Sequence, residues 1–220
     1  MSNEKIVTID NLSLQELDTN SEIIPLLSPE DELEMHKENL PEDLAILPLR
    51  NMVLFPGVVL PITAGRDKSI HLLKEANELG KPVGVVSQIN ENTEDPNLED
   101  IHKIGTVAKI LKILNLPDGN ITVILQGKKR FEIAEISQSE PYLKATVREV
   151  EEIRPESGDA EFKAIVESVK ETSYEMIKEN PNIPSEASFA IKNIESDSFL
   201  INFVCSMSLQ NVCNLLQYST

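Results

Sequence analysis

Apolar positions in the middle of the chain follow the pattern of a β-rich domain with one helix. Short runs of Val, Ile and Leu bounded by Pro, Gly and polar residues are typical of strands. Such runs occupy residues 45–47, 51–55, 58–60, 83–87, 104–115, 120–126, 130–136 and 142–150. Residues 67–79 instead carry apolar side chains at helical spacing, and Gly80 follows as a stop signal. This segment therefore predicts a single helix.

The clearest local signal is a hairpin between residues 104–115 and 120–126. The connection contains Pro117-Asp118-Gly119, in which proline fixes φ, aspartate can bond its own backbone and glycine tolerates a positive φ. Gly127 interrupts the second strand and predicts a bulge or sharp bend. Several strands around one helix, with bends at glycine and proline, predict a small, partly closed barrel.

Two prolines shape the segment before the predicted helix. Pro56-Gly57 predicts a turn between two strands, and Pro61 confines the second strand to the edge of a sheet because it has no N–H to donate.

The last third of the chain has the period of helices. Apolar residues between 162 and 177 recur at i, i+3, i+4 and i+7, and that helix should end before Pro181. Serine or aspartate caps predict three shorter helices, which begin at Ser185, at Ser196 or Asp197, and at Ser208. A polar linker over residues 151–158, which contains Pro and Gly, separates this part from the barrel.

Charge separates a third region from these two. The 220 residues include 37 acidic and 20 basic side chains, for a net charge of −17. Residues 1–43 carry twelve of the acidic residues and only two basic ones. Such a segment buries too little apolar surface to offset its ordering entropy. We therefore expect an acidic, largely flexible arm over residues 1–43, a β-rich domain over 44–153 and a helical subdomain over 154–220.

Two local signals lie within the acidic arm. Ser28 can cap a helix and Pro29 suits its first position, which predicts a short helix over residues 29–38. The apolar pair Ile23 and Ile24 is the only support for the alternative, in which the arm docks on a neighbouring element.

Composition also excludes several classes of protein. The acidic balance disfavours binding to a nucleic-acid backbone or to an anionic membrane surface. No apolar run approaches the roughly 20 residues of a membrane span, the start lacks the features of a signal peptide, and two cysteines are too few for a disulfide framework. We expect a soluble, cytoplasmic chain. Its apolar end suggests that the natural protein continues.

Motifs that would carry catalysis are missing from the sequence. The nearest relative of a phosphate-binding loop runs from Gly119 to Lys129, but seven residues separate its glycines where the motif has four. The three histidines are far apart and lack the spacing of metal ligands. No nucleophile elbow of the GxSxG type occurs. We expect no catalytic, cofactor-binding or metal-binding residue in this chain.

Two blocks of residues resemble the N-terminal domain of Lon proteases. The first is LPLRNMVLFPG at 47–57, which is followed by Leu60-Pro61 and by GRDKSI at 65–70. The second runs from IGTVA at 104–108 through LPDG at 116–119 to Gly127 and Arg130. The resemblance covers residues 44–218. It implies an α+β fold, in which a PUA-like, mostly-β pseudo-barrel with one helix precedes a small helical bundle.

The resemblance also implies a function. Lon is a cytoplasmic, ATP-dependent serine protease that assembles as a homohexamer, and its N-terminal region captures substrates and helps to hold the ring together. This chain would then be the substrate-recognition and assembly region, which binds unfolded or degron-bearing proteins. The ATPase module, with its ATP and Mg, and the Ser-Lys catalytic dyad lie C-terminal to this region in the family. We therefore expect a fragment that is not itself an enzyme.

Two other functions are alternatives to a substrate-binding region of a protease. A stand-alone Lon-N-like binding module without a protease is the alternative to a protease region. Some PUA-like domains bind RNA, but the nearly neutral balance of residues 44–153 disfavours that function here.

Candidate substrate contacts come from two places. A receptor for unfolded proteins needs an accessible apolar patch with a polar rim, and the candidates near the Pro56-Gly57 turn are Met52, Leu54 and Phe55. The alternative is that these three side chains belong to the core.

The resemblance adds the start of the predicted helix as a second substrate-contacting segment. Its candidates are Arg66, Asp67, Lys68 and His71. The alternative for Arg66 is that it braces the turn through hydrogen bonds to carbonyl groups.

Overall fold

The computed structural model describes residues 32, 34, 35, 37, 39–151, 155, 159–179 and 185–217, with only the backbone given for 185–186 and 208–217. The chain divides into two compact units. One is β-rich and holds residues 35–151 together with the chain from Cys205 onward, and the other is helical and holds residues 152–204 with the chain up to Glu34. The domain boundaries proposed from the sequence stay predictions.

Part of the predicted helix over residues 29–38 can be compared with the structure. Glu32, Glu34, Met35 and Lys37 are helical. The rest of that segment, with its predicted caps and the isoleucine pair before it, lies outside the described residues.

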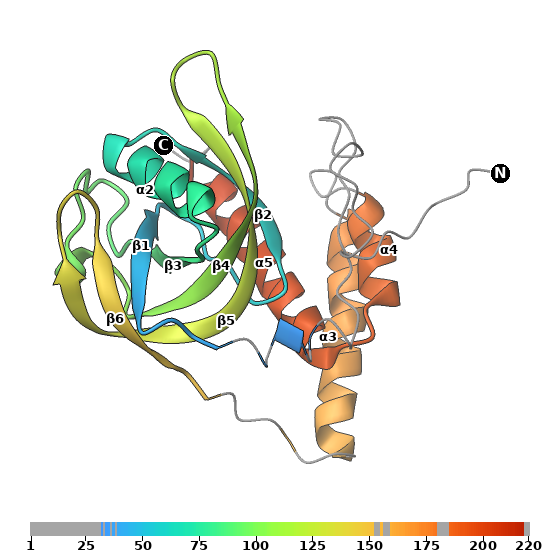
Figure 1. Ribbon diagram of the computed structural model, residues 1–220. Coiled ribbons are helices and arrows are strands. Elements are labelled where there is room, and N and C mark those ends of the chain that lie inside the picture. The colour runs from blue at the N-terminus through green and yellow to red at the C-terminus, as the bar shows by residue number, and fades with distance from the viewer. Residues whose placement is uncertain are drawn as a thin grey trace. The chain divides into compact units, whose positions relative to one another are not determined.

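Within the β-rich unit, the described residues 43–149 form a six-stranded sheet with one α-helix, α2 (Figure 1). Its elements are β1 (Asp43–Leu49), β2 (Val59–Ala64), α2 (Asp67–Glu78), β3 (Val83–Ser87), a 3₁₀ turn η2 (Leu98–Asp100), β4 (Ile104–Asn115), β5 (Ile121–Gln138) and β6 (Lys144–Glu149). The strand order is β2-β5-β4-β3-β1-β6, and a further pairing joins β5 to β6. That pairing closes five strands into a ring and leaves β2 at an edge. The partly closed barrel and its single helix are confirmed.

Length and direction of the strands explain how the ring closes. β5 is 18 residues long, so its first part pairs with β2 and its last part with β6, while β4 lies along its other edge. β1 and β3 are parallel and the other pairs are antiparallel. The helix α2 fits between β2 and β3 along the chain, as its apolar spacing predicted.

The barrel core is almost entirely aliphatic. Its members are Leu44, Ile46, Val86, Ile101, Val107, Phe131, Ile133, Ala145 and Val147. Phe131 is the only aromatic side chain among them and is completely buried.

The predicted turns are present with the expected backbone. Gly119 has a φ of 88° in the β4–β5 hairpin, where the Asp118 carboxylate accepts a hydrogen bond from the N–H of Asn120. Gly57 has a φ of 80° in the turn after Pro56. Gly80 has a φ of 62° where α2 ends.

The predicted irregularity at Gly127 is confirmed. The β4–β5 register shifts between Thr106 and Ala108, opposite Gly127. The Gly127 N–H donates to the carbonyl of Val58 at 2.9 Å, and its carbonyl accepts from the N–H of Gly57 at 3.0 Å. The bend therefore binds the β5 backbone to the turn that precedes β2.

Three strand predictions were wrong. Residues 51–55 form no strand, because their carbonyls are taken by side chains from other strands: Thr106 Oγ1 donates to the carbonyl of Leu54 at 2.7 Å. β2 continues past Pro61 to Ala64, since an edge strand needs no outward N–H at that position. The segments predicted at 120–126 and 130–136 are one strand, β5.

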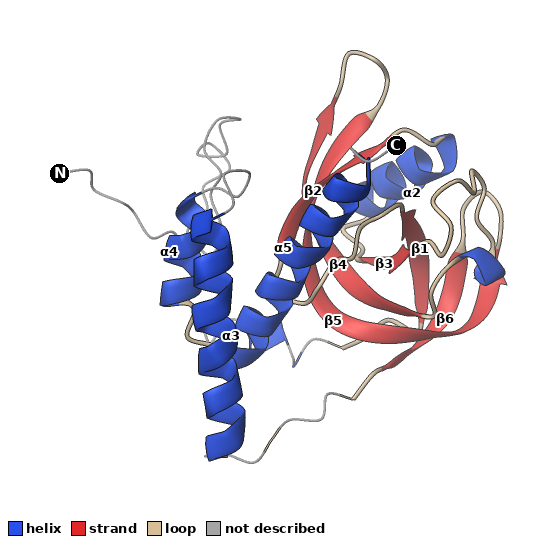
Figure 2. Ribbon diagram, turned by 180° about the vertical axis from the view of Figure 1, so that it is seen from behind, coloured by secondary structure: helices blue, strands red, loops and turns tan. Residues whose placement is uncertain are grey.

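The helical unit contains α3 (Ala160–Glu179), α4 (Ser185–Asn193) and the first part of α5 (Asp197–Gln217) (Figure 2). Asp159 Oδ1 accepts hydrogen bonds from the N–H groups of Glu161 and Phe162 and so caps α3. Ser196 Oγ accepts from the N–H of Phe199, which confirms the predicted cap of α5.

The separate helix predicted from Ser208 was wrong. α5 runs without a break from Asp197 to Gln217, so the described residues from 159 onward form three helices and not four. No proline or glycine interrupts the apolar period in this segment, and a serine that could cap a helix is also tolerated inside one.

Candidate functional site

The apolar candidates before β2 lie in a loop whose backbone is fixed. Leu54 is 3% exposed and belongs to the buried side chains. Met52 and Phe55 are half-buried, and Val53, which the sequence reasoning missed, is 37% exposed. The accessible apolar surface of this loop, here called the 52–55 loop, therefore consists of Met52, Val53 and Phe55.

Three strands hold the 52–55 loop in place. Ser87 Oγ, at the end of β3, donates to the carbonyl of Met52, and Thr106 on β4 donates to that of Leu54. Gly127 on β5 pairs with the turn just after the loop. Because the backbone is already ordered, a partner that binds the apolar side chains pays little for ordering them.

Arg66 lies at the start of α2 and braces the loop between β3 and β4. Its guanidinium donates to Oε1 of Gln88 at 2.7 Å and to the carbonyl of Thr93 at 3.1 Å. Gln88 in turn donates to the carbonyls of Asn90 and Thr93. Burial lowers the pKa of Arg66, and the nearby charge of Arg50 lowers it further. Arg66 thus donates hydrogen bonds to carbonyl oxygens, as the alternative for this residue predicted. The segment that these bonds hold is the β3–β4 loop.

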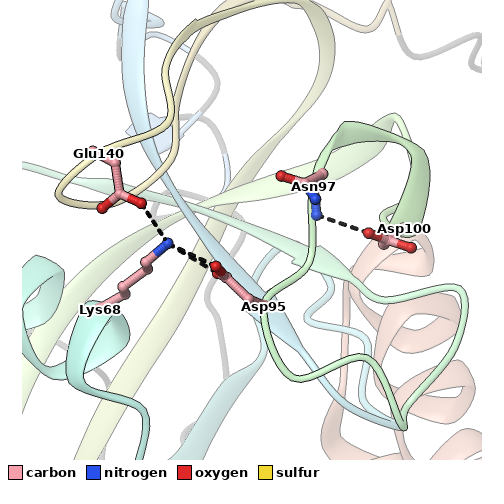
Figure 3. Close-up of polar contacts among 5 residues, drawn as sticks. All are labelled: Lys68, Asp95, Asn97, Asp100 and Glu140. Carbon is pink, nitrogen blue, oxygen red and sulfur yellow. Dashed lines mark hydrogen bonds and ion pairs between the residues drawn. The ribbon is translucent and has the colours of Figure 1, made fainter.

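Lys68 joins three segments that are distant in the sequence (Figure 3). Its ammonium lies 2.9 Å from Asp95 Oδ2 in the β3–β4 loop and 2.9 Å from Glu140 Oε1 between β5 and β6. Hydrogen bonds to these two carboxylates raise the pKa of Lys68. Asp95 and Glu140 are neighbours of the candidate residue Lys68 that sequence reasoning missed, since no local pattern pairs residues 27 and 72 positions apart.

The β3–β4 loop has its own local cap close to this junction. Asp100 Oδ2 accepts a hydrogen bond from the N–H of Asn97 at 2.9 Å, and the two residues form a capping box around η2 (Figure 3). The loop that Arg66 and Lys68 hold is therefore also stabilised from within.

One side of α2 faces the start of β6. His71 lies 3.4 Å from Glu75 through Nε2 and Oε2, and its ring centroid lies 5.7 Å from that of Tyr142. Lys144 Nζ lies 5.3 Å from the centroid of the same tyrosine ring. Asp67 is exposed in the first turn of α2, where a carboxylate favours the positive end of the helix dipole.

A cavity of about 330 Å³ lies beside the second half of α2. It is lined by the start of β1 and the residues before it, by the last turns of α2 with the turn that follows, and by Tyr142 and Lys144. A second cavity of about 400 Å³ lies among α3, α4 and α5 in the helical unit, with a largely polar lining.

The raised pKa of Tyr142 leads to a prediction about the stability of the protein at alkaline pH. Burial, followed by the neighbouring Glu75 carboxylate, raises the pKa of Tyr142 to about 12 from the usual 10. Between these values the folded phenol keeps a proton that the unfolded phenol releases, so this stabilisation is complete below pH 10 and is lost as the pH rises towards 12. We expect Tyr142→Phe to lose stability less steeply than the wild type between pH 10 and 11. Urea midpoints at pH 9, 10 and 11 measure this, and parallel curves would contradict it.

Two other kinds of feature are absent from the part of the chain that the structure describes. No three or more His, Cys, Asp or Glu residues there come together in a way that could hold a metal ion. No helix among those residues has the length and apolar character to cross a membrane.

Comparisons with known proteins give consistent matches. The sequence model of the ATP-dependent protease La (LON) substrate-binding domain matches residues 43–216. The chain is 68% identical over 206 residues to a protein called Lon protease from Flavobacterium johnsoniae, which covers 94% of this chain and 25% of that protein. It is 52% identical over 191 residues to the Lon protease of Cytophaga hutchinsonii, covering 86% of this chain and 24% of the relative.

A solved structure supports the fold. The N-terminal domain of Mycobacterium avium complex Lon protease superposes with a TM-score of 0.58 at 20% sequence identity, over 73% of this chain and 80% of that one. The chain spans about a quarter of the length of the curated relatives that it matches. With a family match over residues 43–216 and relatives of high identity, this chain belongs to the family of Lon substrate-binding domains.

Proposed function

We propose that this chain is the substrate-recognition and assembly region of an ATP-dependent, Lon-type serine protease, and that it binds unfolded or degron-bearing proteins. The observation that carries the proposal is the family match over residues 43–216. It is joined by the similarity to relatives named Lon protease, of whose length this chain covers about a quarter. In this proposal the fragment itself holds no catalytic residue and no cofactor. ATP, Mg and the Ser-Lys dyad belong to the remainder of a longer cytoplasmic protein.

The 52–55 loop supplies a surface suited to such binding. Met52, Val53 and Phe55 are at least partly accessible, and their backbone is fixed by β3, β4 and β5. Each apolar contact of this size is weak, but copies arranged in a homohexameric ring multiply weak contacts through effective concentration. The net charge of −17 gives no reason to add nucleic acid or a membrane as a partner.

Phe55 provides the direct test. We expect Phe55→Ser to weaken binding of an unfolded client several-fold while lowering the melting temperature only slightly, because the side chain is half-buried and its loss leaves the hydrogen bonds of the loop intact. Leu54→Ser is the matched control: its side chain is buried, so we expect a loss of about 2–4 kcal/mol in unfolding free energy.

The measurements are fluorescence anisotropy with a labelled, reduced and carboxymethylated protein as client, and urea unfolding of each variant. If Phe55→Ser lost stability and binding in the same proportion as Leu54→Ser, Phe55 would be a core residue and the loop would not be the binding surface. If the wild-type chain bound no unfolded client at all, the proposed function would fail.

A further inference from the structure

The helix α3 carries more apolar side chains than its own unit buries. Its buried residues are Val166, Ser173 and Ile177. A second row, here called the α3 stripe, follows the spacing i, i+3, i+7 and i+14 and so lies along one side of the helix. The members of the α3 stripe are Phe162, Ile165, Val169 and Met176. Ile165 and Met176 are each 56% exposed, so this side of α3 offers apolar area that another segment could cover.

Charge limits what can cover the α3 stripe. Glu161 lies one turn before Ile165 and Glu179 one turn after Met176, and both glutamates are exposed. At 100° per residue, the lysines of α3 lie beyond the buried row and away from the stripe. The α3 stripe of a second copy would bring the same glutamates to the contact, and every copy carries a net charge of −17, so pairing of two copies is opposed by repulsion. An uncharged apolar segment avoids this cost.

A segment of the acidic arm has this character. Residues 23–27, Ile-Ile-Pro-Leu-Leu, hold four aliphatic side chains in five positions, and no charged residue occurs from position 23 to position 29. They lie outside the described residues. Ile24 precedes a proline, which favours an extended backbone at that position. Five extended residues span about 17 Å, which matches the about 16 Å between Ile165 and Met176 along the axis of α3.

The described structure brings the end of the arm to this unit. Glu32 is helical, and its Oε2 atom accepts a hydrogen bond from Ser196 Oγ at the start of α5. Two residues before Ser196, the carbonyl of Ile194 accepts from Lys170 Nζ, at the middle of α3, at 3.5 Å. Leu27 is five residues before Glu32, so at most about 17 Å of chain joins the apolar segment to this anchor. A segment tethered at such a distance competes at a high effective concentration.

We infer that residues 23–27 bind along the α3 stripe of the same chain and cover Ile165 and Met176. The uncharged segment then serves as a strap on the helical unit, and the α3 stripe is closed to other proteins and to second copies of this chain. The inference goes beyond the proposed function and does not depend on it, because the 52–55 loop belongs to the β-rich unit.

A single tryptophan can report on this contact, because the chain has none of its own. In the 220-residue chain, Ile24→Trp should emit at a shorter wavelength than Asn11→Trp, a control placed earlier in the arm. Acrylamide should quench the tryptophan at position 24 several-fold less than the one at position 11. Both differences should be independent of protein concentration, since the contact forms within one chain.

Charged substitutions assign the contact to the α3 stripe. In the Ile24→Trp chain, Ile165→Glu or Met176→Glu should shift the emission and the quenching towards those of Asn11→Trp, because an apolar cover would have to desolvate the new carboxylate. Phe189→Glu is the control, since Phe189 is 41% exposed on α4 and is not a member of the α3 stripe. All three replaced side chains are exposed, so circular dichroism should show folded variants.

Three results would overturn the inference. The first is equal emission and quenching for Ile24→Trp and Asn11→Trp. The second is a protected tryptophan that responds to Ile165→Glu and Met176→Glu no more than to Phe189→Glu, because the segment would then dock elsewhere. The third is protection that disappears on dilution, which would assign the contact to a second copy. Binding of the carboxymethylated client is measured separately, so each of these results leaves the proposed function standing.

Discussion

Replacement of Phe131 by alanine should cost more stability than any other truncation in the barrel core, about 3–5 kcal/mol of unfolding free energy. The side chain is fully buried and is the only aromatic member of its cluster. The residues around it have adapted to the ring: a methyl group on Gly84 or on Gly105 would come within 2.8 Å of its Cζ atom. Because β3 and β4 carry glycine where the ring lies, these two positions offer no side chain that could fill part of the space.

Two variants control this prediction. Phe131→Leu keeps most of the volume and should cost about 1–2 kcal/mol, with a smaller cavity left behind. Ile104→Ala removes an apolar side chain that is 57% exposed on the same strand as Gly105, and should change stability by less than about 1 kcal/mol. Urea unfolding followed by circular dichroism measures all three. A cost for Phe131→Ala no larger than that for Ile104→Ala would show that the ring does not organise the core.

The parts of the fold that could be predicted from the sequence are those whose causes are local. The β4–β5 hairpin follows from Asp118 and Gly119, whose side-chain hydrogen bond and positive φ are set within four residues. The bounds of α2 follow from apolar spacing and Gly80. The strand Val83–Ser87 was predicted residue for residue, because the run is short and polar or turn-forming residues bound it on both sides.

The errors have non-local causes. The 52–55 loop has the composition of a strand, but Thr106, 52 positions away, takes the carbonyl of Leu54 with its hydroxyl. A propensity argument cannot include a partner that only the folded sheet brings near. Ser208 shows the reverse problem: a capping residue is a local signal, but the continuous helix around it gives it no end to cap.

The residues of the candidate site also fall into two groups, those that the sequence could indicate and those that only the folded structure shows. Arg66, Asp67, Lys68 and His71 were chosen from a segment of sequence, and the structure places all four on or beside the first turns of α2. The residues that give this segment its geometry, Asp95, Glu140 and Tyr142, come from the β3–β4 loop and from the chain around the start of β6. No spacing rule connects them with α2, so only the closed barrel reveals that they are neighbours.

Replacement of Gly127 by alanine should be the most damaging single-methyl addition in the barrel. A Cβ atom at this position would lie 2.2 Å from the carbonyl oxygen of Phe55 and 2.9 Å from its carbonyl carbon. Both are backbone atoms, so no rotation of a side chain relieves the overlap. The added methyl group would have to displace the turn with which Gly127 exchanges two hydrogen bonds: the Gly127 N–H donates to the carbonyl of Val58, and the Gly127 carbonyl accepts from the N–H of Gly57. We expect a loss of about 3 kcal/mol, at the upper end of overpacking costs.

Gly119→Ala is the appropriate control, because it adds a methyl group to a glycine of the same barrel without any steric overlap. Gly119 has a φ of 88° and no atom within 4 Å of its Cβ position, so alanine there should cost only the about 1–2 kcal/mol of a left-handed backbone. Equal losses for the two variants would mean that the overlap at Gly127 is relieved at no cost.

The Gly127 variant should also affect binding. Because Gly127 positions the turn that follows Phe55, a shift of this turn displaces the side chain that we propose as a client contact. At 10 °C and without denaturant, with circular dichroism to check that the variant is folded, Gly127→Ala should bind the unfolded client more weakly than Gly119→Ala does. Loss of binding together with loss of the folded circular dichroism spectrum would mean that the substitution unfolds the barrel and does not act through the loop.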